Sequence, residues 1–282
     1  MADHDREPEA EAEAEREGDR DREVAPAGRV RHTEHVMGTV FSFDLRHRST
    51  AAVQQALREA VHWLHQIDRL FSTYRPDSVI SRLNSGVTER RDVPAEVERV
   101  LVMCEQAEAA TGGAFSARPA PGPDLSRGGL DPSGLVKGWA VEHAYAILRA
   151  AGAPNSAVNG GGDIRLGGEP APGRPWCVGI ADPARPGELL TTVSGRDFAV
   201  ATSGVAERGP HILDPRTGRP VRQLLAATVT GPDLTWADTW ATAAMVLGPA
   251  AHEWIAAQAG YELLTVDSGG EARRTSGFPL TV

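Results

Sequence analysis

The sequence predicts an α+β fold built around a largely antiparallel sheet. The chain has 282 residues, 41% of them hydrophobic, which is enough to bury a sizeable core. Segments with strand and helix patterns follow one another without the regular alternation that a doubly wound parallel sheet requires. A glycine run at 160–162 joins two short strand-like segments directly.

The N-terminal half is expected to contain one strand and three helices. Residues 36–46 alternate apolar and polar positions, as a half-buried strand does. Apolar residues recur at helical spacing over 50–70, 94–111 and 133–152; Gly112 and Gly113 follow the second segment, and the third closes on Gly152. The Pro- and Gly-rich residues 117–129 are expected to form a loop.

The C-terminal half is expected to be mostly strands. A strand, a glycine turn and a second strand occupy 155–168. Further strand patterns cover 176–183, 190–195, 197–204, 226–231, 261–267 and 278–282, with a turn inside 211–221. Two helices, 236–247 and 249–259, are separated by Gly248 and Pro249.

The acidic charge is concentrated at the N-terminus. Residues 1–26 carry 11 acidic and 4 basic side chains, out of 38 and 29 in the whole chain. Such a segment buries too little apolar surface to offset its chain entropy. We therefore expect a disordered acidic tail over 1–28 and one folded domain over 29–282. That domain is nearly neutral, which argues against a nucleic-acid-binding surface.

Membrane and export signals are not found in the sequence. No run of about eighteen apolar residues occurs, so no membrane span is expected. The first residues lack the positively charged region and the apolar region of a secretory signal, and no cysteine is available there for a lipid anchor. We therefore expect a cytoplasmic protein. Neither HExxH nor GxSxG occurs, so the sequence gives no signal for a zinc protease or a serine hydrolase.

Asp238 and Thr242 form a candidate metal site. They stand four residues apart on a predicted helix, so their oxygens share one face. A carboxylate beside a hydroxyl suits Mg²⁺, which prefers oxygen ligands and keeps positions for phosphates. The alternative is structural: an aspartate favoured by the helix dipole and a threonine bonded back to its own helix.

Lys137 is the only lysine among 29 basic residues. It falls in the first turn of a predicted helix, where the helix dipole disfavours a cation. This position indicates that the ammonium meets a carboxylate or a phosphate, although chance retention of one lysine is the alternative. Asp131 and Ser133 precede the same helix.

Two turns add further candidates. The glycine run before Asp163 lets the backbone approach a ligand closely, but it lacks the spacing of a dinucleotide or phosphate-binding loop. A simple hairpin turn is the alternative. His211 ends a strand before a tight turn, where an imidazole is able to act as a base or to play a purely structural role.

These signals, in this order, resemble the ApbE family of FAD:protein FMN transferases. The resemblance runs from about residue 34 to the C-terminus. The segments that carry it are HVMGT (35–39), FSTYRPDSVISRLN (71–84), GGAF (112–115), LDPSGLVKGWAVEHA (130–144), NGGGDI (159–164), WCVGIADP (176–183), ATSG (201–204), HILDPRTGRPV (211–221) and ADTWATAAMVLG (237–248).

The resemblance implies a fold, an activity and a set of residues. Members of this family have an ApbE-like (T-fold-like) architecture, bind FAD and Mg²⁺, and move FMN to a Ser or Thr of an acceptor flavoprotein, releasing AMP. His211 and Lys137 are implied as catalytic, and Asp238, Thr242, Gly134 and Ala241 as metal-binding. The FAD site is implied to comprise Met37, Tyr74, Ala114, Phe115, Asp131, Lys137, Gly161, Gly162 and Ile212.

Two departures and three alternatives remain open. Ser116 stands where the family commonly has Asp, and Ala206 follows TSG-Val where a Tyr is common. One alternative is an FAD pyrophosphatase that gives FMN and AMP. Another is an FAD-binding protein without catalysis. The third is an interaction module built around the acidic tail.

Overall fold

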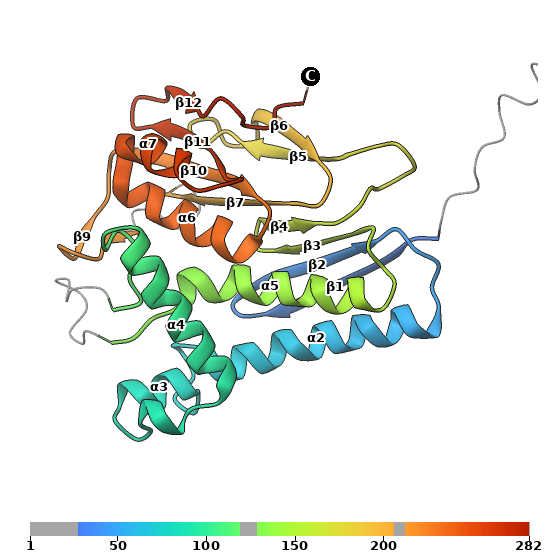
Figure 1. The fold of residues 1–282 in the computed structure, drawn as a ribbon, viewed down its shortest axis with the longest axis horizontal. Helices are drawn as coiled ribbons and strands as arrows, with labels where there is room; N and C mark the ends of the chain where they lie inside the picture. The colour runs from blue at the N-terminus through green and yellow to red at the C-terminus, as the bar shows by residue number, and fades with distance from the viewer. Residues whose placement is uncertain (1–27, 119–128, 206–211, 282) are drawn as a thin grey trace, which may run out of the picture.

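The computed structural model describes residues 28–118, 129–205 and 212–281 (Figure 1). Its strands are β1 (Val30–Val36), β2 (Thr39–Leu45), β3 (Ser156–Gly160), β4 (Asp163–Leu166), β5 (Trp176–Ala181), β6 (Leu189–Gly195), β7 (Phe198–Gly204), β8 (Leu213–Asp214), β9 (Arg219–Pro220), β10 (Leu224–Gly231), β11 (Glu262–Asp267) and β12 (Ala272–Arg274). Its helices are α2 (Ala51–Phe71), α3 (Val79–Asn84), α4 (Ala95–Ala110), α5 (Ser133–Ala150), α6 (Leu234–Leu247) and α7 (Ala251–Ala256), with 3₁₀ turns at Arg90–Asp92 and Gly248–Ala250.

One large sheet organises the molecule. Its strand order is β1-β2-β3-β4-β7-β10-β11-β12, and every neighbouring pair runs antiparallel. The pairs β5–β6 and β8–β9 form two separate two-stranded sheets. The prediction of an α+β fold with a largely antiparallel sheet is confirmed.

Alternate residues of the central strand β7 contact different cores. Ala199 and Ala201 belong to the large cluster that the helices cover, whereas Val200 belongs to a smaller cluster with Trp176 and Val193 from the β5–β6 sheet. This follows from the two-residue period of a strand. The large sheet is therefore packed on both faces, with α5 and α6 on one and β5–β6 on the other (Figure 1).

Local sequence explains where the long helices begin and which side they bury. Thr50 caps α2 by accepting a hydrogen bond from the Val53 amide, and one stripe including Leu57 and Leu64 is buried. Asp233 caps α6 in the same way through the Trp236 amide. α5 and α6 are buried on most sides because α2 covers α5 and β7 and β10 support α6.

Three element predictions need correction. The single strand predicted at 36–46 is the second half of a hairpin, because Met37 and Gly38 adopt positive φ and turn the chain between β1 and β2. The helix predicted at 249–259 is confined to Ala251–Ala256 after a 3₁₀ turn. The strand predicted at 278–282 is reduced to one bridge between Leu280 and Val193.

Some expectations concern residues outside the described part. The expected tail over 1–28 lies outside it except for Gly28, as do most of the expected loop 117–129, Ala206 and His211. Within the described residues, no helix combines the length and apolar character needed to cross a membrane.

Candidate active site

A cavity of about 1090 Å³ opens at the end of the large sheet where α5 and α6 meet it. This is slightly larger than the roughly 300–1,000 Å³ typical of small-ligand sites. Its walls come from the β1–β2 turn, the C-terminal end of α2, the start of α5, the β3–β4 turn, the end of β7 and the middle of α6. The β5–β6 sheet adds one further wall through residues 178–187.

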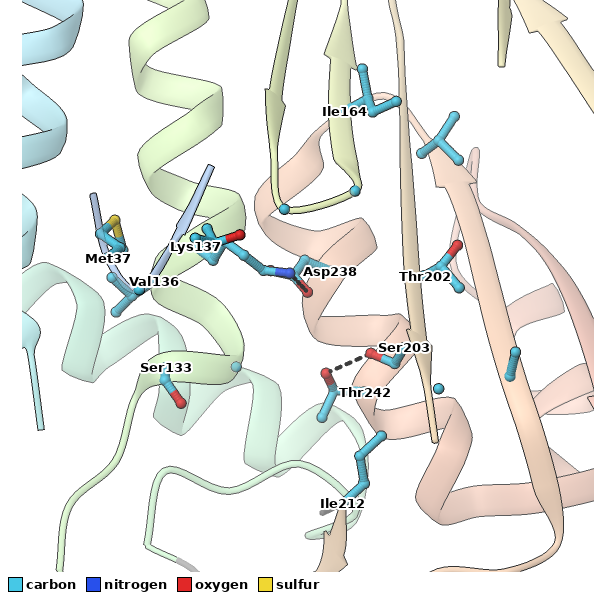
Figure 2. A pocket seen from close by; sticks show the side chains of 18 of the residues that line it. Met37, Ser133, Val136, Lys137, Ile164, Thr202, Ser203, Ile212, Asp238 and Thr242 are labelled. Carbon is cyan, nitrogen blue, oxygen red and sulfur yellow. Dashed lines mark hydrogen bonds and ion pairs between the residues drawn. The ribbon is translucent and has the colours of Figure 1, made fainter. Parts of the chain in front are cut away.

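Three charged side chains meet beside this cavity, and two of them, Lys137 and Asp238, line it. Lys137 on α5 forms ion pairs with Asp163 at the start of β4 and with Asp238 on α6, whose Oδ1 lies 3.7 Å from the Lys137 Nζ. Asp163 and Asp238 are 1% and 4% exposed, respectively. Figure 2 shows the Lys137 side chain reaching across from α5 to Asp238. Two buried carboxylates therefore share one lysine.

Main-chain amides fix both carboxylates. The Gly138 amide donates to Oδ2 of Asp238 over 3.0 Å, and the Thr202 amide donates to Oδ1 of Asp163 over 2.9 Å. The first bond requires α5 and α6 to approach closely, and a Cβ at Gly138 would lie 2.6 Å from the Leu234 carbonyl oxygen. Only glycine fits this crossing without displacing a helix.

Burial dominates the electrostatics of Asp238. It raises the pKa of this carboxyl far above its usual range, the attraction of Lys137 lowers it in part, and the charge of Asp163 raises it again. Because the Asp238 carboxyl is costly to ionise and lines the cavity, a cation bound beside it would stabilise its ionised form. The electrostatics therefore fit a metal ion.

Thr242 extends the oxygen-rich face of α6 by one turn. Its Oγ1 hydrogen-bonds to Oγ of Ser203 on β7 over 3.1 Å (Figure 2). Thr239 on the same helix instead donates back to the Thr235 carbonyl over 2.7 Å. Asp238, Thr242 and Ser203 thus direct a carboxylate and two hydroxyls toward one side of the cavity.

The donor types narrow the choice of metal. Among the described residues, no three His, Cys, Asp or Glu side chains are grouped to hold an ion. A metal here would depend on one carboxylate, hydroxyl and main-chain oxygens, and oxygens of a bound ligand. This donor set suits Mg²⁺, which keeps positions for water or phosphate, and not a zinc site of the Cys/His type.

Tight turns form the rim beside the lysine. Gly161 and Gly162 have φ of 62° and 99°, and a Cβ on Gly161 would lie 2.7 Å from Oγ1 of Thr39. Met37 also has a positive φ of 54°, which costs a non-glycine residue on the order of 1–3 kcal/mol. Met37 lines the cavity (Figure 2), so this strained turn places its side chain at the cavity wall.

The other predicted FAD-binding residues also line the cavity. Tyr74, 96% exposed, stands at its rim, whereas Ala114, Phe115 and Ile212 are buried in its walls. Asp131 lies before α5, where its side chain accepts a hydrogen bond from the Ser133 amide. All of the predicted FAD residues are therefore gathered around one space.

Two predicted metal-binding residues differ in position. Gly134 lines the cavity against Phe115, but Ala241 is fully buried and does not line it. His211 and Ala206 lie outside the described residues, whereas the departing residue Ser116 lines the cavity.

Sequence reasoning did not single out Asp163, Thr202 or Ser203 as site residues. The only local signal for Asp163 is its place directly after the glycine run. Its contact with Lys137 depends on β4 lying beneath α5, which the sequence pattern does not reveal.

Comparisons with known proteins point to one family. The model of the ApbE family matches residues 37–125 and 123–265. The FAD:protein FMN transferase of Vibrio cholerae is 28% identical over 276 residues, covering 79% of this chain and 83% of that protein. The FAD:protein FMN transferase of Rhodobacter capsulatus is 36% identical over 141 residues, which are 46% of this chain but only 26% of that protein.

Solved structures show the same architecture. The flavin transferase ApbE from Vibrio cholerae superposes with a TM-score of 0.76 at 25% identity, covering 89% of this chain and 97% of that one. The ApbE protein from Thermotoga maritima gives a TM-score of 0.75 at 23% identity, covering 88% and 97%. Because the family model matches most of the residues and these structures share the fold, the chain belongs to the ApbE family.

Proposed function

We propose that this protein is an FAD:protein FMN transferase that uses Mg²⁺ to move the FMN half of FAD onto a Ser or Thr of an acceptor flavoprotein. The observation that carries the proposal is the ion-paired group of half-buried Lys137 with the buried Asp163 and Asp238, of which Lys137 and Asp238 line a cavity large enough for a dinucleotide. Family membership and the names of the relatives support the same activity.

The metal ligands would come mainly from α6. We propose that Asp238 and Thr242 hold Mg²⁺, with main-chain oxygens of Gly134 and Ala241 as further ligands. The buried Ala241 would need a local opening to contribute. When bound, the ion would neutralise charge that develops on the phosphate oxygens of FAD. Lys137 keeps the Asp238 carboxylate turned toward the cavity through its ion pair.

The transfer step needs a base as well as charge stabilisation. The acceptor oxygen forms a bond to the phosphorus of the FMN half, the bond between the two phosphates of FAD breaks, and AMP leaves. The hydroxyl proton passes to a base, for which we propose His211. Tyr74, exposed at the rim, offers an aromatic surface against which the flavin ring is able to stack.

Product analysis tests this proposal directly. The purified protein is incubated with FAD and Mg²⁺, with and without a flavoprotein acceptor, and AMP and protein mass are followed together. Equal amounts of AMP and of FMN adduct on the acceptor are expected. AMP with free FMN would indicate a pyrophosphatase, and FAD binding without AMP would indicate a binding protein. The expected cytoplasmic location stays a prediction, which cell fractionation tests.

A further inference from the structure

Two hydrogen bonds connect α5 and α6. In the first, the Gly138 amide donates to Asp238 over 3.0 Å. In the second, the Leu234 amide at the start of α6 donates to Oε2 of Glu142 over 2.8 Å. The partners are four residues apart on each helix and the two helices run in opposite directions, so the two bonds lie one helical turn apart. The first bond holds Asp238, the proposed metal ligand, and the second joins Glu142 and Leu234, which do not line the cavity.

Both hydrogen bonds lie beside ion pairs that come from the same strand, β4. Asp163 on β4 forms an ion pair with Lys137, next to the bond between Gly138 and Asp238. Arg165, two residues further along β4, donates its Nε to Oε1 of Glu142 over 2.9 Å. Residues two apart on a strand face the same side, so β4 contacts α5 through two ion pairs of opposite polarity. The second pair thus ties the start of α6 to the sheet.

In the ion pair of Arg165 with Glu142, the arginine is buried, the glutamate is half-buried, and several contacts hold the arginine. Arg165 is 6% exposed, donates to the Leu166 carbonyl over 2.7 Å, and lies over the Tyr145 ring at 4.7 Å. Burial raises the pKa of Glu142, and the attraction of Arg165 lowers it only in part. A buried ion pair is often no more stabilising than apolar residues of the same size. The several contacts that orient this ion pair therefore indicate a role other than stability.

We propose that Glu142 is a positioning residue, which through Arg165 and the Leu234 amide fixes the first turn of α6 and so holds Asp238 at the distance that Mg²⁺ binding needs. The inference rests on the proposed function. Glu142 and Arg165 do not line the cavity, so they act only through the position of α6. The residues that hold metal ligands in place typically contribute about 10- to 100-fold to metal affinity.

Metal affinity separates this role from simple stabilisation. Mn²⁺ replaces Mg²⁺ as the probe, and its dissociation constant for the FAD-loaded protein is measured by electron paramagnetic resonance. Glu142→Gln keeps the shape but loses the charge, and about tenfold weaker Mn²⁺ binding is expected. The FAD dissociation constant is expected to stay within about twofold, because Glu142 does not line the cavity.

A control and a second variant complete the test. Glu98→Gln on α4 removes the carboxylate of an exposed ion pair with Arg90, and unchanged Mn²⁺ affinity is expected. If Glu142→Gln does not fold, Arg165→Lys keeps the charge but loses the guanidinium fork, and several-fold weaker Mn²⁺ binding is expected. A folded Glu142→Gln protein with a lower melting temperature and wild-type Mn²⁺ affinity would overturn the inference. Wild-type protein that binds no Mn²⁺ would refute the proposed metal site itself, and with it the inference.

Discussion

Replacing Gly138 by alanine tests the close helix crossing that supports the site. In an open helix position this change stabilises a protein by about 1 kcal/mol. Here the new Cβ would lie 2.6 Å from the Leu234 carbonyl oxygen and 2.9 Å from Cβ of Asp238. Neither atom belongs to the free end of a flexible side chain, so the helices must separate by roughly 0.8 Å at the contact.

The expected cost follows from that displacement. Overpacking of this kind costs about 1–3 kcal/mol, and we expect the upper end because a backbone carbonyl is involved. After the gain in helix propensity, a net loss of about 2 kcal/mol remains, which lowers the melting temperature of a domain this size by about 4–8 °C. Mn²⁺ affinity should fall as well, since Asp238 moves away from Lys137.

Thermal unfolding and Mn²⁺ titration measure both effects. For stability, Gly134→Ala is the matched control on the same helix, because the nearest atoms to its Cβ would be side-chain carbons, of Phe115 at 3.2 Å and of Thr242 at 3.9 Å. We expect it to change the free energy of unfolding by less than about 1 kcal/mol. A Gly138→Ala protein as stable as the wild type, or more stable, would refute the crossing described above.

Three further substitutions test the same site. Asp238→Asn should abolish Mg²⁺-dependent AMP release. Because burial raises the pKa of Asp238 in the folded protein, its ionisation opposes folding once the pH passes the unfolded pKa near 4. Metal-free wild type should thus lose stability relative to Asp238→Asn as the pH rises from there until the folded pKa is passed, by about 1.4 kcal/mol per unit of the rise, in urea unfolding at several pH values. Lys137→Arg should lower turnover by about tenfold or more, because a guanidinium is larger than the ammonium that Asp163 and Asp238 enclose; wild-type kinetics there would remove the special role of the lysine. Gly161→Ala should weaken FAD binding in a fluorescence titration, because the new Cβ meets Thr39 at 2.7 Å and the backbone has a positive φ; unchanged affinity would separate this turn from the ligand site.

Most of the fold could be predicted from local patterns. α2, α4, α5 and α6 show helical spacing of apolar residues, and glycines mark the ends of α4 and α5. The β1–β2 hairpin could not be predicted, because its turn uses Met37, a residue type that ordinarily avoids positive φ. The C-terminal segment has a strand pattern, but only Leu280 forms a bridge, since the chain end adds to β6 at one point.

The candidate site was predictable where one helix carries it. Asp238 and Thr242 are brought together by helical spacing alone. The partners of Lys137 were not predictable, because Asp163 reaches it from a strand and Asp238 from another helix. Glu142 and Arg165 are distant in sequence in the same way. Contacts of this kind depend on how β4, α5 and α6 pack, which residue patterns do not specify.

The location of the metal tests the central claim most directly. Crystals of the protein grown with FAD and Mn²⁺ give an anomalous signal that marks the ion. The account predicts a peak within about 2.3 Å of the Asp238 carboxylate and the Thr242 hydroxyl, facing the FAD phosphates. A peak elsewhere in the cavity, or bound FAD with no peak beside Asp238, would contradict the assignment of this acidic cluster as the metal centre of the transferase.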